Sequence, residues 1–509
     1  MAHVTTSWHA ALDQTCAKGE LPHDHSSGAK SEVTPDPGDL EDLLDLVGAK
    51  ITEVRDDSGA DSGHTVGTAA EAKHSVDNLA SGVRLGRRQG CATASESKDA
   101  DDNRPAEVRA AFKIDADSAA RSNAVSDHRR RGPRQVVPPR LLSQENVTMD
   151  QAVGIRRLLF NDTKRVLPDS WRRQGFFFSR ASALGYGLIQ SAGGPCGVLA
   201  SVQAFVLREL LFPTEASPVS DYRNPTPIEQ ARALVSSLAR IIFTASGSSG
   251  HCFVFLPSKS ACLSRSSSYS PDGVTEKLQC WELAAESCSS LELFIGEHLR
   301  HFSDPFGCGA VLLLFSCIMT RGLANVKMDM DEGFVGEVRT LLDRHAYMAQ
   351  EGVNLLLVGK AVTNVFDGDR KLSDEGSSGD VVTLCGIPQR GTVGFLTLLE
   401  SYNYLEVGRH YKEPEVPVWV VFSESHYSVL FGLDLELSQS AEGGRSRDIF
   451  YWDGLAKQRE EIMLTVLSEH DEELPDQNDP HALIPPLDLV CRTKWRGAMV
   501  DWNGAEEIL

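Results

Sequence analysis

The chain has 509 residues and a formal net charge of -21, and both numbers bound its function before any motif is considered. The length allows two or three domains. The acidic balance makes nucleic acid an unexpected partner, because backbone phosphates are bound by clustered Lys and Arg. The longest apolar run, residues 310–319, is too short to span a membrane and is typical of a buried strand or helix.

The opening residues and the cysteines indicate where the protein acts. The first residues lack the basic lead and the apolar stretch of a secretory signal. The eleven cysteines show no C-x-x-C spacing, so neither a disulfide framework nor a zinc site is indicated. We expect a cytoplasmic protein, which could also enter the nucleus, with reduced thiols and no membrane association.

Residues 1–148 differ in composition from the rest of the chain. They contain only two aromatic residues, Trp8 and Phe112, and are predicted to be largely disordered. Within them, residues 39–47 carry apolar side chains at helical spacing, which predicts either a short docking helix or a transient helix without a role. The basic run at 128–134 is read as a nuclear-import signal or a solvated linker.

From residue 149 to residue 509 the composition is that of a globular domain with mixed helices and strands. The strand-like apolar runs are 251–256, 354–359, 416–422, 427–433 and 449–454, and the helical stretches include 278–288 and 335–348. The last three strands are close enough in sequence to pair as an antiparallel meander. These features predict an α+β fold with a largely antiparallel sheet. Two Ser/Gly-rich stretches, 264–273 and 373–380, are predicted to be surface loops.

The stretch IQSAGGPCGVLASVQAFVLRELLF, residues 189–212, places Cys196 between Gly-Gly-Pro and a run of helix formers. Because Pro195 is favoured in a first helical turn, Cys196 is predicted to lie at the helix N-terminus. The free backbone N–H groups and the dipole there favour an anion, and so a thiolate. The glycines leave room for a substrate, so the setting suits a nucleophile; the alternative is a small residue at a tight helix start.

A nucleophilic cysteine needs a base, normally a histidine that is distant in sequence. His426 is the best placed, because it begins a strand just after another strand ends in a polar corner. His251 also begins an apolar strand and is the rival. His298 and His301 share one helical face and could bind a metal, but a single pair at this spacing is a weak signal.

Two further polar residues could complete such a site. Asp453 follows the next predicted strand and could orient the imidazole of His426, although an ordinary Asp-Gly turn explains it equally well. Gln190 lies six residues before Cys196 and could donate a hydrogen bond to an oxyanion, together with the backbone N–H of Cys196. The alternative for Gln190 is a plain surface glutamine.

The motifs of the second half resemble those of the MINDY deubiquitinases, papain-like cysteine peptidases that cut ubiquitin chains. The matching stretches are YGLIQSAGGPCGVLASVQAFVLRELLF, LLLVGKAVTNVFDGDR, GFLTLLESYNYLEVG, PVWVVFSESHYSVLF, FYWDGLAKQREEI and PPLDLVCRTKWRGAMVDWNG. They cover most of residues 149–509 in the right order. The first half matches nothing in the family, and the 264–273 and 373–380 loops look expanded.

The resemblance implies a papain-like fold and a thioester mechanism without metal or organic cofactor. Carried over by position, the nucleophile is Cys196, the base His426 and the oxyanion glutamine Gln190, while Asp453 rests on strand order alone. The implied substrates are polyubiquitin and ubiquitinated proteins, with preference for the degradation-type, lysine-forty-eight linkage. The rivals are a catalytically silent ubiquitin-binding scaffold and a different Cys-His enzyme on the same fold.

Overall fold

The computed structural model describes residues 136–214, 218–331, 338–373, 381–439, 446–467 and 484–506. The predicted helix at 39–47 and the basic run at 128–134 lie outside these residues, as does most of the segment expected to be disordered. Strand β1 (Arg140–Asn146) pairs with a strand that begins at Leu278. The folded part therefore starts before the boundary at residue 148 that composition indicates.

More of the described residues lie in helices than in strands, and several helices begin at clear sequence signals. α4 and α7 start at capping boxes in which Thr148 and Thr226 exchange hydrogen bonds with the residue three positions later. The helices are α4 (Met149–Phe160), α5 (Asp169–Arg172), α6 (Cys196–Leu211), α7 (Pro227–Ala245), α8 (Cys288–Ser303), α9 (Gly309–Arg321), α10 (Leu323–Asp329), α11 (Gln350–Val358), α12 (Leu398–Ser401), α13 (Arg409–Lys412) and α14 (Pro486–Lys494), with 3-10 turns η1 (Thr275–Lys277) and η2 (Leu435–Ser438).

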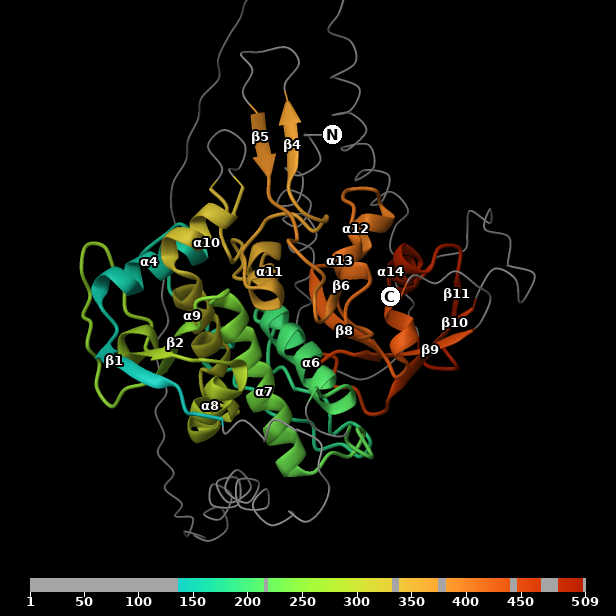
Figure 1. Cartoon of the computed structure of the whole chain (residues 1–509), viewed down its shortest axis with the longest axis horizontal. Coiled ribbons are helices and arrows are strands. Elements are labelled where there is room, and N and C mark those ends of the chain that lie inside the picture. The colour runs from blue at the N-terminus through green and yellow to red at the C-terminus, as the bar shows by residue number, and fades with distance from the viewer. Residues whose placement is uncertain are drawn as a thin grey trace, which may run out of the picture. The chain divides into compact units, whose positions relative to one another are not determined.

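Helix α6 is the central element, because it lies between α7 and a six-stranded sheet (Figure 1). Its sequence predicts one apolar face, but nearly every side chain from Cys196 to Arg208 is buried. The helix is enclosed on all sides, since α11 and the sheet cover the faces that α7 leaves free. The N-terminus of α6 is thereby held rigidly between helices and sheet.

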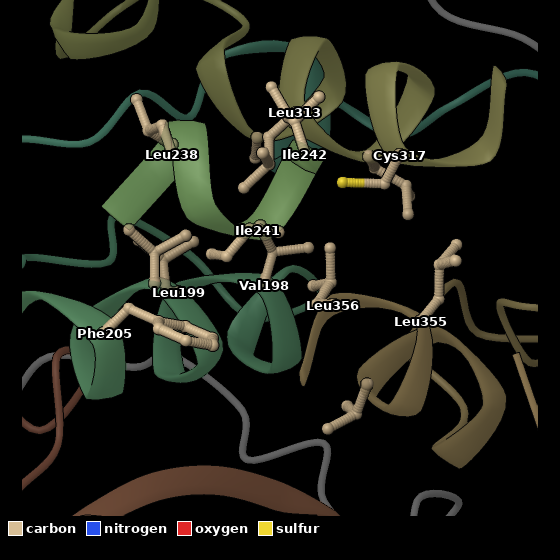
Figure 2. Packing of buried hydrophobic residues seen from close by; sticks show 14 of the residues in the cluster. Val198, Leu199, Phe205, Leu238, Ile241, Ile242, Leu313, Cys317, Leu355 and Leu356 are labelled. Atoms are coloured by element: carbon tan, nitrogen blue, oxygen red, sulfur yellow. The ribbon is translucent and has the colours of Figure 1, made fainter. Parts of the chain in front are cut away.

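The helical core joins α6 to three other helices (Figure 2). Side chains that meet there are Val198, Leu199 and Phe205 of α6, Leu238, Ile241 and Ile242 of α7, Leu313 and Cys317 of α9, and Leu355 and Leu356 of α11. The sequence predicts either a strand or a helix for residues 310–319, and in the structure they lie within helix α9. The prediction of a strand at 354–359 is wrong: residues 354–358 belong to α11 and Gly359 is its C-cap, because an apolar run this short does not distinguish a strand from a buried helix.

A three-stranded antiparallel sheet, in the order β1-β3-β2, packs beside these helices. β2 (His251–Pro257) is the predicted strand, but the helix predicted at 278–288 is wrong, because residues Leu278–Ala284 form β3. Buried and partly exposed residues alternate along much of β3, as in a strand with two different faces. In the stretch 335–348, also predicted as helix, the described residues from 338 onward contain an isolated bridge and turns instead.

The six-stranded sheet has the order β11-β10-β9-β8-β7-β6. Its strands are β6 (Gly394–Thr397), β7 (Val418–Ser423), β8 (His426–Gly432), β9 (Arg447–Trp452), β10 (Ile462–Leu467) and β11 (Met499–Asp501). All neighbours are antiparallel except β6 and β7. The predicted meander of the last three apolar runs is confirmed as β7-β8-β9, and the α+β class with a largely antiparallel sheet is observed.

The two Ser/Gly-rich stretches differ from a simple pair of surface loops. Most of the stretch 373–380 lies outside the described residues, between the short paired strands β4 (Arg370–Ser373) and β5 (Val381–Leu384). The stretch 264–273 exposes its serines, but Tyr269 is fully buried and Asp272 forms a buried ion pair with Arg156 of α4. This loop is therefore anchored at its C-terminal end.

Among the described helices, none is by itself long and apolar enough to cross a membrane. α9 and α10 pass the length and composition criteria only when taken together, and they are bent by 87° at their junction.

Candidate active site

Cys196 is the first residue of α6, as the sequence predicts, and Pro195 is the N-cap. The first backbone N–H groups of a helix have no partner within it, and the helix dipole is positive at this end. Both favour a negative charge on the sulfur atom. The Cys196 thiol is only 1% exposed, and its Sγ lies 3.9 Å from the carbonyl oxygen of Gly194.

Gly194 shapes the turn that leads into Cys196. Its φ is +120°, and a methyl group at this position would lie 2.9 Å from Ser170 Oγ and 3.2 Å from Trp171 Nε1. Only glycine combines this backbone conformation with this lack of space. Trp171 is itself fixed, because its buried Nε1 donates a hydrogen bond to the carbonyl oxygen of Ala346 at 2.8 Å.

His426 is the first residue of β8 and follows a tight turn in which Glu424 and Ser425 have φ values of +48° and +64°. Two consecutive residues with positive φ are typical of the turns that connect hairpin strands. The turn carries the imidazole to the edge of the core, where its side chain is 27% exposed. His426 Nε2 lies 2.9 Å from Oδ1 of Asp453.

Asp453 directly follows β9, the strand adjacent to β8, so the meander brings it beside His426. Its Oδ1 also accepts a hydrogen bond from the backbone N–H of Leu455 at 2.8 Å. Asp453 is 9% exposed. The carboxylate is therefore held in place from its own turn while it contacts the imidazole.

The imidazole also contacts the thiol of Cys196, and both contacts raise the pKa of His426. Burial lowers the pKa of His426, but hydrogen bonds to Asp453 and Cys196, together with the negative charges of these two groups, raise it from 6.5 to about 10. Because Nε2 contacts Asp453, Nδ1 is the ring nitrogen left for Cys196. The structure thus brings Cys196, His426 and Asp453 into one hydrogen-bonded series.

Gln190, six residues before Cys196, is also buried, with 4% of its surface exposed. Its backbone N–H donates to the carbonyl oxygen of Gly454 at 3.0 Å, which places it beside the turn that carries Asp453. Its Nε2 donates to the carbonyl oxygen of Ala192 at 2.7 Å, which leaves the second amide hydrogen uncommitted by that bond. Gln190 is not a surface residue.

The segment that contains Tyr347 and Met348 packs against the N-terminus of α6. A methyl group on Gly197 would lie 2.7 Å from Cβ of Met348, so glycine here allows that segment to approach the helix closely. Tyr347 lies beside Gly193, which is itself exposed. Since the Cys196 thiol is almost fully covered, a substrate carbonyl reaches it only when neighbouring side chains move.

The other cysteines of the described residues lie in surroundings that make them poor nucleophiles. Burial is the largest cause of a raised pKa in each of the eight: Cys252, Cys262, Cys280, Cys288, Cys308, Cys317, Cys385 and Cys491. A raised pKa keeps a thiol protonated and poorly nucleophilic. Among the described cysteines, Cys196 is the one in hydrogen-bond contact with an imidazole.

The rival histidines lie elsewhere in the fold. His251 begins β2 of the three-stranded sheet and pairs with Glu282 at 2.8 Å. The imidazole of His298 stacks on Phe294, and its Nδ1 lies 2.9 Å from the carbonyl oxygen of that residue. In the described part of the chain, no group of three or more His, Cys, Asp or Glu side chains is arranged to hold a metal ion.

Two buried glutamines near the site are not indicated by the sequence. Gln174 and Gln203 bind the backbone of the stretch that leads to Gln190. Neither has a fixed spacing from Cys196 or a neighbouring motif that would mark it. Their role depends on which backbone groups the fold brings next to them, and a single sequence carries no signal for that.

Comparison with known proteins identifies the family. The conserved domain of the deubiquitinating enzymes MINDY-3/4 matches residues 156–504. The probable ubiquitin carboxyl-terminal hydrolase MINDY-4 of Mus musculus is 39% identical over 378 residues, which are 73% of this chain and 49% of that protein. The MINDY-4 protein of Bos taurus is 40% identical over 364 residues, 71% of this chain and 46% of its own length.

MINDY-3 proteins match over a shorter stretch. The ubiquitin carboxyl-terminal hydrolase MINDY-3 of Mus musculus is 34% identical over 299 residues, 54% of this chain and 63% of that protein. No solved structure matches the chain. The chain spans about half the length of the MINDY-4 proteins that it matches. By the extent of the family domain, the chain belongs to the MINDY-3/4 family of deubiquitinating enzymes.

Proposed function

We propose that this chain is a cysteine-type deubiquitinase that hydrolyses isopeptide bonds in polyubiquitin, with Cys196 as the nucleophile. The observation that carries the proposal is the contact of His426 with both Cys196 and Asp453 at the N-terminus of α6. Family membership supplies the substrate class. A cysteine at a helix N-terminus that faces a histidine on a largely antiparallel sheet also supports the papain-like architecture expected from the sequence.

The reaction runs in two steps. The Cys196 thiolate attacks the carbonyl carbon of the C-terminal glycine of ubiquitin, and a tetrahedral oxyanion forms. The imidazolium of His426 then gives its proton to the nitrogen of the leaving lysine amine, the C–N bond breaks, and a thioester remains. Neutral His426 next takes a proton from water, whose oxygen attacks the thioester carbonyl. The C–S bond breaks, and ubiquitin leaves with a free carboxylate.

Asp453 and Gln190 have supporting roles in this scheme. The carboxylate of Asp453 orients the imidazole and stabilises the imidazolium that donates the proton. Gln190 donates its second amide hydrogen to the oxyanion, with the backbone N–H of Cys196 as the other donor. All steps use side chains of the chain and water.

The preference for the degradation-type, lysine-forty-eight linkage belongs to the same proposal and rests on the family resemblance. The tail of ubiquitin carries arginines, and the net charge of -21 is complementary to a basic tail. Ubiquitinated proteins in the cytoplasm are the proposed cellular substrates.

A second candidate function is a ubiquitin-binding scaffold without activity. The observation that favours it is the burial of Cys196, which is 1% exposed. A scaffold would keep Cys196 buried when ubiquitin binds, whereas an enzyme must expose it during each cycle.

Treatment of the full chain with a ubiquitin probe that bears a C-terminal electrophile separates the two candidates. We expect a covalent adduct with the wild type and none with Cys196→Ala. Cys288→Ala is the matched control, because this partly buried thiol lies at the start of α8, and its adduct should be unchanged. Ubiquitin binding without an adduct would favour the scaffold, and a panel of chains of different linkage tests the preference.

A further inference from the structure

The backbone on both sides of Gln190 is held by one buried side chain, that of Gln174. Gln174 Oε1 accepts a hydrogen bond from the backbone N–H of Ser191 at 2.8 Å. Its Nε2 donates to the carbonyl oxygen of Ile189 at 3.1 Å. Gln174 is 0% exposed, so water cannot replace either bond. The residues immediately before and after Gln190 are thus both bound to the same amide.

Gln174 is in turn fixed by the corner between α8 and α9. Its carbonyl oxygen accepts from the backbone N–H of Ala310 in the first turn of α9 at 2.9 Å, and its Nε2 also donates to the carbonyl oxygen of Gly175 at 2.7 Å. A methyl group on Gly175 would lie 1.9 Å from the carbonyl oxygen of Asp304, so the chain passes very close to this corner. The amide of Gln174 therefore has a rigid base in the helical core.

The third constraint on Gln190 comes from the sheet. The carbonyl oxygen of Gly454 accepts the N–H of Gln190, and Gly454 directly follows Asp453. Gln190 is thus bound between the helical core, through Gln174, and the turn that orients His426. Residues 189–195 form no helix or strand of their own, so these side-chain and turn contacts replace a regular hydrogen-bond ladder.

We propose that Gln174 is a positioning residue that sets the place of the oxyanion donor Gln190. The proposal rests on the proposed function, because it concerns a step of that reaction. An oxyanion donor is effective only when it is held in advance where the charge develops. Loss of the Gln174 amide frees the carbonyl oxygen of Ile189 and the N–H of Ser191, and the side chain between them then samples positions that do not reach the oxyanion.

The chain offers a matched control in Gln203 of α6. This glutamine is also buried, its Oε1 accepts from the N–H of Leu188 at 2.6 Å, and its Nε2 donates to the carbonyl oxygen of Tyr186 at 3.0 Å. It binds the same stretch with the same chemistry but does not flank Gln190. Gln174→Met and Gln203→Met each remove one buried amide while they keep an unbranched side chain of similar length.

The test measures kcat and KM of the full chain on ubiquitin with a fluorogenic C-terminal amide, and the rate at which iodoacetamide labels Cys196. We expect Gln174→Met to lower kcat by about 10- to 100-fold, less than or similar to the loss of an oxyanion donor itself. KM and the labelling rate should change little, because the thiol and imidazole are untouched. Gln203→Met should lower Tm about as much as Gln174→Met does, because each removes one buried amide, but it should leave kcat within about threefold of the wild type.

A double-mutant cycle with Gln190→Ala gives the decisive result. If Gln174 acts through Gln190, Gln174→Met should cause almost no further loss in the Gln190→Ala background. Full additivity of the two losses would overturn the proposal, as would an equal kcat loss from Gln203→Met. Gln174→Glu keeps an oxygen acceptor for the N–H of Ser191 and loses the amide donor to the carbonyl oxygen of Ile189. It is the second variant for the case in which the methionine variant fails to fold, and it should lower kcat in the wild-type background but cause almost no further loss in the Gln190→Ala background.

The outcomes that would overturn the role of Gln174 differ from those that would overturn the proposed function. A wild-type chain that neither forms the probe adduct nor hydrolyses the fluorogenic amide would overturn the proposed function. A wild type that hydrolyses the amide, next to a folded Gln174→Met variant of unchanged kcat, would overturn only the role of Gln174.

Discussion

The two sides of the candidate site are held in place by different means. His426 and Asp453 lie on the β7-β8-β9 meander, where backbone pairing between neighbouring strands determines their positions. Gln190 lies within the irregular stretch 189–195, and Cys196 directly follows it. Side chains of distant residues, among them Gln174, hold this stretch by hydrogen bonds to its backbone. The position of the sheet-side residues should therefore tolerate the loss of a single supporting side-chain bond, whereas the position of Gln190 on the loop side depends on the one amide, that of Gln174, which binds both of its neighbours.

The largest expected effect comes from Asp453→Asn, which removes the charge that orients His426 but leaves the meander intact. We expect kcat/KM to fall by about 10²-fold or more, within the range of positioned acid–base groups. The pKa of His426 should also fall from about 10, because one of the negative charges that raise it is gone. The alkaline limb of the pH–rate profile should therefore move to lower pH, as steady-state kinetics between pH 5 and pH 11 would show.

The raised pKa of His426 also affects the stability of the fold. The folded-state pKa of His426 lies above its unfolded value of 6.5, so its contribution to the free energy of unfolding is complete below that value and is lost as pH rises through about 10. Urea titrations should show a weaker pH dependence in Asp453→Asn across this window. Asp448→Asn, an exposed position on β9 that accepts a bond from Thr465, is the control. A variant profile identical to that of the wild type would contradict the assigned contact.

The next largest effect should come from Gly194→Ala on the loop side. The φ of +120° and a contact of 2.9 Å with Ser170 Oγ leave no room for the methyl group. Backbone strain of this kind costs about 1–3 kcal/mol. We expect lower stability in urea and about tenfold slower labelling of Cys196, since 1.4 kcal/mol corresponds to that factor.

Gly193→Ala is the neighbouring control for this prediction. A methyl group there would meet only Tyr347, at 3.5 Å, an ordinary contact. If both variants slow labelling equally, the turn at Gly194 is not what positions the thiol.

The smallest effect should come from Gln458→Ala on the sheet side. Gln458 Oε1 accepts from the backbone N–H of Asp453 at 2.6 Å, and its Nε2 donates to the carbonyl oxygen of Tyr451 at 3.2 Å. We expect a stability loss of about 1 kcal/mol and a change in kcat/KM below threefold, because strand pairing still holds Asp453. A fall in kcat/KM as large as that expected from Gln174→Met would show that the sheet side and the loop side of the site do not differ in this way.

The parts of the fold with strong local signals were predictable. The helix start at Cys196 follows from Pro195 and the apolar run after it, and the meander follows from three apolar runs separated by polar corners. His426 and Asp453 could be nominated together because antiparallel neighbours bring the ends of adjacent strands close. Those two residues and Cys196 do lie together in the structure.

The predicted secondary structure is wrong where a short run of residues fits both the helical and the strand period. Residues 354–358 form the end of α11 rather than a strand, and 278–284 form β3 rather than a helix, because packing against the rest of the fold decides between the two. Composition indicates a boundary at residue 148, but the structure begins earlier with β1, which is mostly exposed and polar and is held by its pairing with β3.

The sequence by itself determined the chemical types at the site and the elements that carry them: a cysteine at a helix start, a histidine after a strand turn and an acid after the next strand. Periodicity and turn signals act over a few residues, so the sequence can be read at that range. Only the tertiary structure decided that His426 rather than His251 meets the thiol, that Gln190 is buried, and that Gln174 clamps its neighbours. These depend on contacts between residues far apart in the chain, which packing of the whole core selects.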